Sequence, residues 1–167
     1  MHENRVILSA LVQNHAGVLV RVAGLFSRRA FNIDSLTVSE TEDPAYSRMT
    51  ISAHGERAQI KQISRQLMKL EDVVRLIILP SREAVCAELL LVKVLPGQNR
   101  EALHKLAEAR GAKIRDEENG SVMLEYTGAT EALDAFVREL GAYRIRELAR
   151  TGITALGRGD QVLIREE

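Results

Sequence analysis

In the first half of the chain, segments with the hydrophobic pattern of a strand alternate with segments that have the hydrophobic spacing of a helix. Residues 6–13 are mostly apolar and predict a strand, and the Gly17 that follows introduces a helical spacing. The apolar side of this predicted helix comprises Val18, Leu19, Val22, Leu25 and Phe26. Residues 32–40 are expected to be extended, and residues 41–44 (Thr-Glu-Asp-Pro) predict a turn. Residues 46–53 then alternate with a period of two, which is typical of a half-buried strand.

A second helix and another strand follow this hairpin. The apolar positions of the helix are Ile60, Ile63, Leu67 and Leu70. Residues 73–79 form an apolar run that stops at Pro80 and predicts a strand. The expected order is therefore β-α-β-β-α-β, which is the order of a ferredoxin-like module.

The same order of elements repeats in the second half. Residues 85–95 predict a strand, and residues 112–117 and 121–127 predict a hairpin whose Asn119-Gly120 favours a tight turn. A final strand is expected at residues 144–150. The two intervening helices are marked by Leu103, Leu106, Ala107, Leu133, Phe136, Val137 and Leu140. We therefore predict an α+β protein of two tandem ferredoxin-like βαββαβ modules, residues 1–80 and 81–167, joined near residues 80–83.

The first predicted strand is apolar on both of its faces. Val6, Leu8, Ala10 and Val12 form one face, whereas Ile7 and Leu11 make the other partly apolar. A sheet that carries helices on one side normally shows a polar second face to water. The second face is therefore expected to be buried against the second module or another subunit.

Composition and charge narrow the possible classes of protein. Of the 167 residues, 46% are hydrophobic and 28% charged, and 23 basic residues balance 23 acidic ones. A neutral chain has no overall attraction to nucleic acid or anionic membranes. No apolar run approaches the roughly 20 residues that span a bilayer, and no signal-like segment opens the chain, so we expect a cytoplasmic protein. The single cysteine, Cys86, precludes an internal disulfide and is expected to be a small buried hydrophobe.

Sequence motifs for catalysis or metal binding are absent. The chain has no glycine-rich phosphate loop and no paired-cysteine or His-Glu-x-x-His spacing, so no catalytic residue and no metal ligand is predicted. The four histidines, His2, His15, His54 and His104, are expected to be solvated or locally hydrogen-bonded.

Ferredoxin-like modules also include RNA-binding domains, which stack bases on aromatic side chains of their central strands. The central strand at residues 47–52 lacks aromatic side chains, and this disfavours RNA binding. A small stand-alone enzyme on this scaffold remains an alternative, which a turnover assay on the isolated chain would decide.

The loop between the first strand and the first helix carries the most informative chemistry. A helix N-terminus offers unpaired N–H groups that suit a carboxylate. Asn14 and Asn32 are uncharged donors and acceptors that suit a zwitterionic amino acid, and Val18 and Ile33 could form an apolar wall. Alternatively, Asn14 caps the helix and Gly17 only eases the turn. Spacing alone slightly favours this second interpretation.

Several segments resemble a known family. Residues 7–29 (Ile-Leu-Ser-Ala-Leu-Val-Gln-Asn-His-Ala-Gly and onward) resemble the start of an ACT domain, a βαββαβ module that binds amino acids at subunit interfaces. Residues 31–44 (Phe-Asn-Ile-Asp-Ser-Leu and onward) and 47–51 (Ser-Arg-Met-Thr-Ile) resemble the acetolactate synthase small-subunit family, also called acetohydroxyacid synthase regulatory subunits. Residues 91–94 and 150–160 are similar to that family's second domain. The resemblance covers nearly the whole chain and is looser between Gly97 and Thr130.

This resemblance implies a regulatory subunit rather than an enzyme. In the family, the small subunit activates a separate catalytic large subunit in branched-chain amino-acid (valine, leucine, isoleucine) biosynthesis and confers feedback inhibition by valine. Thiamine diphosphate, Mg²⁺ and FAD belong to that large subunit, and no cofactor is expected in this chain. An ACT-type amino-acid sensor that regulates a different enzyme or regulator is the alternative.

The resemblance also implies an effector site between the ACT domains of a homodimer. One chain would contribute Asn14, His15, Ala16, Gly17 and Val18, with only the backbone of His15 and Ala16 involved. The other chain would contribute Asn32 and Ile33.

Overall fold

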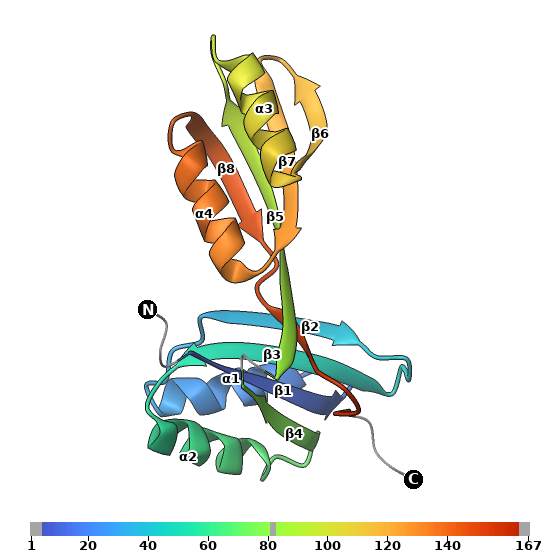
Figure 1. Cartoon of the computed structure of the whole chain (residues 1–167). Coiled ribbons are helices and arrows are strands. Elements are labelled where there is room, and N and C mark those ends of the chain that lie inside the picture. Colours follow the sequence, from blue (N-terminus) through green and yellow to red (C-terminus); the bar gives the residue numbers. More distant parts are fainter. Residues whose placement is uncertain (1–4, 81–82, 164–167) are drawn as a thin grey trace. The chain divides into compact units, whose positions relative to one another are not determined.

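The protein divides into two compact units. The computed structural model describes residues 5–80 and 83–163. The first unit is formed within residues 1–86 and 152–167, and the second within residues 87–151 (Figure 1).

The first unit has a four-stranded antiparallel sheet with the order β2-β3-β1-β4. Figure 1 shows both of its helices on one face of this sheet. The elements of the module are β1 (Arg5–Gln13), α1 (Val18–Arg28), β2 (Ser35–Glu40), β3 (Tyr46–His54), α2 (Arg57–Leu67) and β4 (Val73–Leu79). Both the element order and the strand order are those of a ferredoxin-like module.

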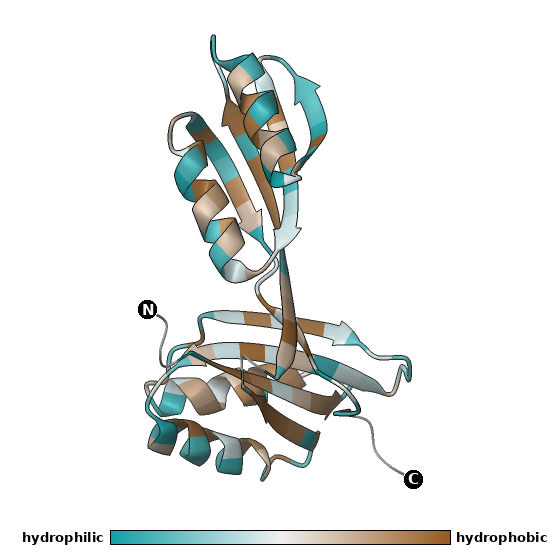
Figure 2. Cartoon of the chain, in the orientation of Figure 1, coloured by the Kyte–Doolittle hydropathy of each residue, from teal (hydrophilic) through white to brown (hydrophobic). Residues whose placement is uncertain are grey.

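The core of the first unit lies between the sheet and its helices. Leu8, Ala10 and Val12 of β1 pack there against the buried sides of α1 and α2. The apolar stripes of the two helices supply the other side of this core: Val18, Val22, Leu25, Phe26, Ile60, Ile63 and Leu67. Figure 2 shows the resulting pattern, in which hydrophilic and hydrophobic residues alternate along both helices.

The opposite face of this sheet is also buried. Ile7 of β1 and Leu79 of β4 pack there against Ala84, Ile153 and Ala155. Ala84 opens β5 (Ala84–Leu95), and Ala155 lies in β9 (Thr154–Gly157), which pairs with β5. The predicted burial of the second face is confirmed, and the covering residues come from the start of β5 and from this unit's own C-terminal segment.

The segment from Gly152 onward, which covers this second face, changes the expected division of the chain into two units. The boundary was expected after residue 80, whereas residues up to Cys86 and the segment from Gly152 onward belong with the first unit. The physical reason is that Ile153 and Ala155 bury apolar surface of the first sheet. Two hydrogen bonds fasten the segment to β2: Thr37 Oγ1 donates to the Ile153 carbonyl (3.0 Å), and the Ile153 amide donates to Ser35 Oγ (3.3 Å).

The second unit repeats the topology with the strand order β6-β7-β5-β8. Its core joins Leu90, Val92 and Val94 of β5 to both helices, and Figure 1 shows these helices on one face of the sheet. The β6–β7 hairpin turns through Asn119 and Gly120, whose φ angles of 51° and 77° confirm the predicted tight turn. The remaining elements are α3 (Arg100–Arg110), β6 (Lys113–Glu118), β7 (Ser121–Gly128), α4 (Thr130–Leu140) and β8 (Arg144–Arg150).

The prediction of two tandem ferredoxin-like modules is therefore confirmed. Cys86 is half-buried beside the covering segment rather than fully buried. His15, His54 and His104 are locally hydrogen-bonded, as expected, and His2 lies outside the described residues. No helix in the described part of the chain is both long enough and apolar enough to cross a membrane.

Candidate functional site

The loop between β1 and α1 is exposed and ends in an open helix N-terminus. Residues 13–17 are exposed, whereas Val18 is buried in the core. Gly17 occupies the N-cap position with φ of 91°, a left-handed conformation that favours glycine. No side chain caps this helix, and its first turn contains no acidic residue. Among the described residues, no side chain accepts from the first amides of α1, and such amides suit a carboxylate.

The Asn14 side chain braces the neighbouring β2–β3 connection instead of capping α1. Its amide nitrogen donates to Glu40 Oε1 (3.0 Å) and to the Pro44 carbonyl (2.9 Å). Its Oδ1 accepts a hydrogen bond from Ser47 Oγ (3.0 Å). The alternative interpretation of Asn14 as a helix cap is therefore wrong, because Gly17 takes that position. One acceptor lone pair of Oδ1 remains for a further partner.

Asp72 organises the other side of this loop, and the sequence pattern did not single it out. Its buried carboxylate accepts from Arg21 of α1, with Nε 2.6 Å from Oδ2 and Nη2 2.9 Å from Oδ1. His15 Nε2 lies 3.0 Å from the same Oδ1. The Asp72 carbonyl also accepts from the Gln13 amide (2.8 Å). A lone Asp at the start of a strand has no spacing signal, because its partners are distant in the sequence.

Asn32 and Ile33 lie before β2 rather than in the β1–α1 loop. Asn32 is exposed, and Ile33 packs against the core between the sheet and helices. Among the described residues, no hydrogen bond joins either of them to residues 14–18. Within one chain the structure therefore groups Asn14, His15, Ala16, Gly17 and Val18 and leaves Asn32 and Ile33 apart.

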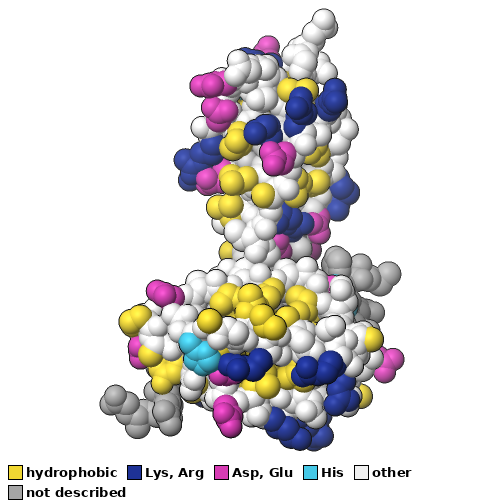
Figure 3. Space-filling view, turned by 180° about the vertical axis from the view of Figure 1, so that it is seen from behind, with side chains coloured by type: hydrophobic (Ala, Val, Ile, Leu, Met, Phe, Trp, Pro, Cys, Tyr) yellow, Lys and Arg dark blue, Asp and Glu magenta, His cyan; other side chains and the backbone are white. Residues whose placement is uncertain are grey.

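Large apolar side chains remain exposed on α1, which follows this loop, and on the edge strand β2. Val20 of α1 is 74% exposed, Leu19 44%, and Val38 of β2 42%. Figure 3 shows hydrophobic side chains gathered on one face of the first unit, with Lys and Arg beside them. Such an apolar patch on a small unit is typical of an interaction surface.

Several acidic and histidine side chains of the described residues form ion pairs rather than a metal-binding cluster. In residues 5–80 and 83–163, no group of three or more His, Cys, Asp or Glu side chains could hold a metal ion. The most connected carboxylate of the second unit, Glu88, is buried and accepts from Arg150 (Nη2–Oε2 2.7 Å) and from Thr130. Arg150 also pairs with Asp134 (2.7 Å). Burial would lower the pKa of Arg150, but the hydrogen bonds and charges of Asp134 and Glu88 raise it overall, as in a structural ion pair.

Two family models match the chain and fall on successive parts of it. Residues 8–75 match the AHAS small subunit-like ACT domain. Residues 87–159 match the small subunit of acetolactate synthase. The first module is therefore an ACT domain, as expected.

Several relatives resemble the chain over nearly its whole length. It is 42% identical to a probable acetolactate synthase small subunit of Methanothermobacter thermautotrophicus, over 98% of both chains. It is 40% identical to the acetolactate synthase isozyme 3 small subunit of Escherichia coli, over 95% of this chain and 99% of that one. The crystal structure of the acetolactate synthase small subunit of Thermotoga maritima superposes with a TM-score of 0.88 at 36% identity, covering 94% of this chain and 99% of that one. The chain thus belongs to the family of acetolactate synthase small subunits.

Proposed function

We propose that this protein is the non-catalytic regulatory subunit of a cytoplasmic acetolactate synthase. It activates a catalytic large subunit in branched-chain amino-acid biosynthesis and makes that subunit sensitive to valine. Thiamine diphosphate, Mg²⁺ and FAD are bound by the large subunit. The relatives that are named small subunits of this enzyme support the role.

The observation that carries the effector proposal is the uncapped N-terminus of α1. A valine carboxylate would accept from the first amides of the helix, where Gly17 lets the backbone approach without a side chain. The ammonium would donate to an oxygen of the loop, for which Asn14 Oδ1 retains a lone pair. Neutral groups of this kind match a zwitterion, because they satisfy both charges without adding a net charge to the site.

The second half of the effector site is proposed to come from another copy of this chain. Asn32 and Ile33 form no hydrogen bond with the loop among the described residues, and the exposed Leu19, Val20 and Val38 lie on α1 and β2. A homodimer that buries these apolar side chains gains hydrophobic free energy, which is at most about 1.5–3 kcal/mol for each one and less for the half-buried Leu19 and Val38. It would also bring Asn32 and Ile33 of one protomer to the β1–α1 loop of its partner.

Regulation follows from this arrangement as a difference in affinity between two states. Valine at the dimer interface favours one arrangement of the ACT domains, and the large subunit binds another more tightly. The strength of the inhibition is set by the ratio of the affinities with which the two arrangements bind valine. Asn14 belongs to the valine side of this scheme, where its bonds to Glu40 and the Pro44 carbonyl fix its position beside the β1–α1 loop.

The test is reconstitution with the catalytic subunit of the same organism, measuring acetolactate formation from pyruvate with and without valine. The native chain should stimulate activity, and valine should reverse the stimulation. Asn14→Ala should raise the half-inhibitory valine concentration at least about tenfold, since a lost hydrogen bond to a charged group is worth about 1.5–3 kcal/mol. Stimulation should be unchanged. If stimulation fell as much as inhibition, Asn14 would be a structural residue.

A matched control separates contact with valine from support of the loop. Ser47→Ala removes only the hydroxyl that donates to Asn14 Oδ1 and leaves the amide bonds to Glu40 and Pro44. Its effect on valine inhibition should be much smaller. Equal effects of both variants would show that Asn14 acts by positioning the loop. No stimulation by the native chain would instead favour an ACT-type sensor for another partner.

A further inference from the structure

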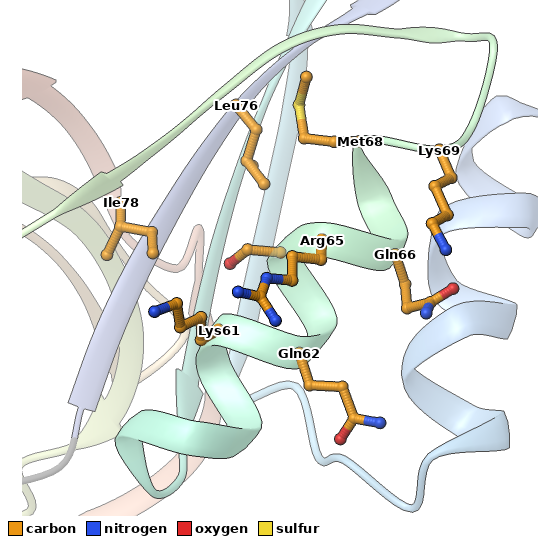
Figure 4. A pocket seen from close by; sticks show the side chains of 9 residues that line it. Lys61, Gln62, Arg65, Gln66, Met68, Lys69, Leu76 and Ile78 are labelled. Carbon is orange, nitrogen blue, oxygen red and sulfur yellow. The ribbon is translucent and has the colours of Figure 1, made fainter.

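A groove runs between α2 and β4 of the first unit, and the proposed effector site does not use it. It encloses about 700 Å³ and is open to solvent. Figure 4 shows Leu76 and Ile78 on the strand above α2, with Met68 following the helix. Ile78 is 43% exposed and Met68 48% exposed, so the floor of the groove offers apolar surface to water.

The helix side of the groove is positively charged. Lys61 and Arg65 are four residues apart on α2 and therefore lie on one side of the helix, and Lys69 follows its end. None of these three cations forms an ion pair with a described residue, and no carboxylate lines the groove. Unpaired cations above an apolar floor fit a partner that carries negative charge beside apolar side chains.

The strand side of the groove is an open sheet edge. β4 is terminal in the order β2-β3-β1-β4, and among the described strands it pairs with β1 alone. Such a sheet edge can accept an added strand. Peptide recognition by strand addition draws affinity from such groups and specificity from the neighbouring side-chain pockets.

We propose that this groove docks an extended segment of the catalytic large subunit, acidic in charge and anchored by apolar side chains. The segment would pair along β4, bury apolar side chains against Met68, Leu76 and Ile78, and place carboxylates near Lys61, Arg65 and Lys69. The inference rests on the proposed function, and it assigns the partner a surface separate from the α1–β2 face proposed for the homodimer. Valine and the large subunit would then act on the same ACT domain from opposite edges of its sheet.

The first experiment measures the affinity of the full-length chain for the intact large subunit. The double variant Lys61→Glu, Arg65→Glu should weaken binding at least about tenfold at moderate salt. Its valine affinity, measured by calorimetry, and its dimeric state should be unchanged. A control with the same charge change, Arg138→Glu, Arg146→Glu in the second unit, should bind as the native chain does. Equal loss in both variants, or no loss in the first, would overturn the proposal.

The second experiment identifies the occupant of the groove. A photo-crosslinking residue at Gln62, which lines the groove, should link to one Asp- and Glu-rich stretch of the large subunit. Links to a second copy of this chain, or to a stretch without acidic residues, would overturn the proposal. If the native chain binds the large subunit but these results fail, only the docking surface is wrong. If the native chain does not bind at all, the proposed function fails as well.

Discussion

The two modules share one topology but treat the face of the sheet opposite the helices differently. In the first unit this face is buried by Ala84, Ile153 and Ala155, none of which is more than 4% exposed. In the second unit the corresponding face carries Leu91, which is 36% exposed, and the ion pair Lys93–Glu147 (3.6 Å). One sheet is thus a middle layer, and the other is one-sided.

The polar side chains on these two sheet faces differ in their burial in the same way. The covered sheet buries Ser9, Thr50 and Ser52 on or near its second face, each at most 1% exposed. Burial also lowers the pKa of the Arg48 guanidinium, against the opposing charge of Glu42. On the open sheet, the half-exposed Arg115 donates through Nε to Oε2 of the half-buried Glu125 (2.6 Å), and this bond lowers the pKa of Glu125. Two sheets of the same topology can therefore differ in solvent exposure. In the first unit, the covering segment excludes solvent from the second face of the sheet.

The largest effect is expected where the covering segment is weakened. Ile153→Ala should lower the free energy of unfolding of the first unit by about 2–4 kcal/mol, because a buried Ile leaves a cavity in a packed layer. Urea unfolding followed by hydrogen exchange of β1 and β4 would measure this loss.

The matched substitution on the open sheet is Leu91→Ala. The Leu91 side chain already contacts water, so the loss there should be about 1 kcal/mol or less. Similar losses at the two positions would contradict the contrast between a covered and an open face.

Local patterns in the sequence predicted most of the fold. The apolar stripe of α1 and the Asn119-Gly120 turn depend on neighbours a few residues away, so periodicity and turn chemistry suffice. The double-sided burial of β1 was also visible, in Ile7 and Leu11. The partner of that face was not, because β9 lies far along the chain and has only the four residues Thr154–Gly157. A short strand has too few positions to show a period.

The candidate site was predicted only where the chain itself brings residues together. Residues 14–18 form one loop, and their exposure fits the prediction. Asp72 was missed because its ion pair joins residues 51 positions apart. The bonds of Asn14 to Glu40 and Pro44 were missed for the same reason, since they span 26 and 30 positions. Contacts of this kind depend on the packed fold and leave no local pattern.

An intermediate loss of stability is expected when one partner of an ion pair is neutralised, and its size should depend on how exposed the pair is. Asp72→Asn leaves Arg21 without its carboxylate partner in a partly buried setting, and should cost about 1–2 kcal/mol after allowance for the half-exposed Arg21. Glu147→Gln on the open sheet should cost no more than about 0.5 kcal/mol, because Glu147 is 74% exposed. Thermal unfolding compared at low and high salt would measure both. A larger loss for Glu147→Gln would contradict the contrast.

The smallest loss of stability on the covered face is expected at Ser52, one of its buried hydroxyls. Ser52 Oγ is buried without a hydrogen-bond partner among the described residues, whereas Ser9 Oγ accepts from Arg48 Nη1 (3.0 Å). Ser52→Ala removes an unsatisfied group and should leave stability unchanged or raise it by up to about 1 kcal/mol. Ser9→Ala should lower stability by about 1–2 kcal/mol, since it leaves the half-buried Arg48 without that acceptor. Denaturant midpoints measured side by side would resolve these opposite signs. A loss at Ser52 equal to that at Ser9 would mean that water reaches the covered face, and the first sheet would then be no drier than the second.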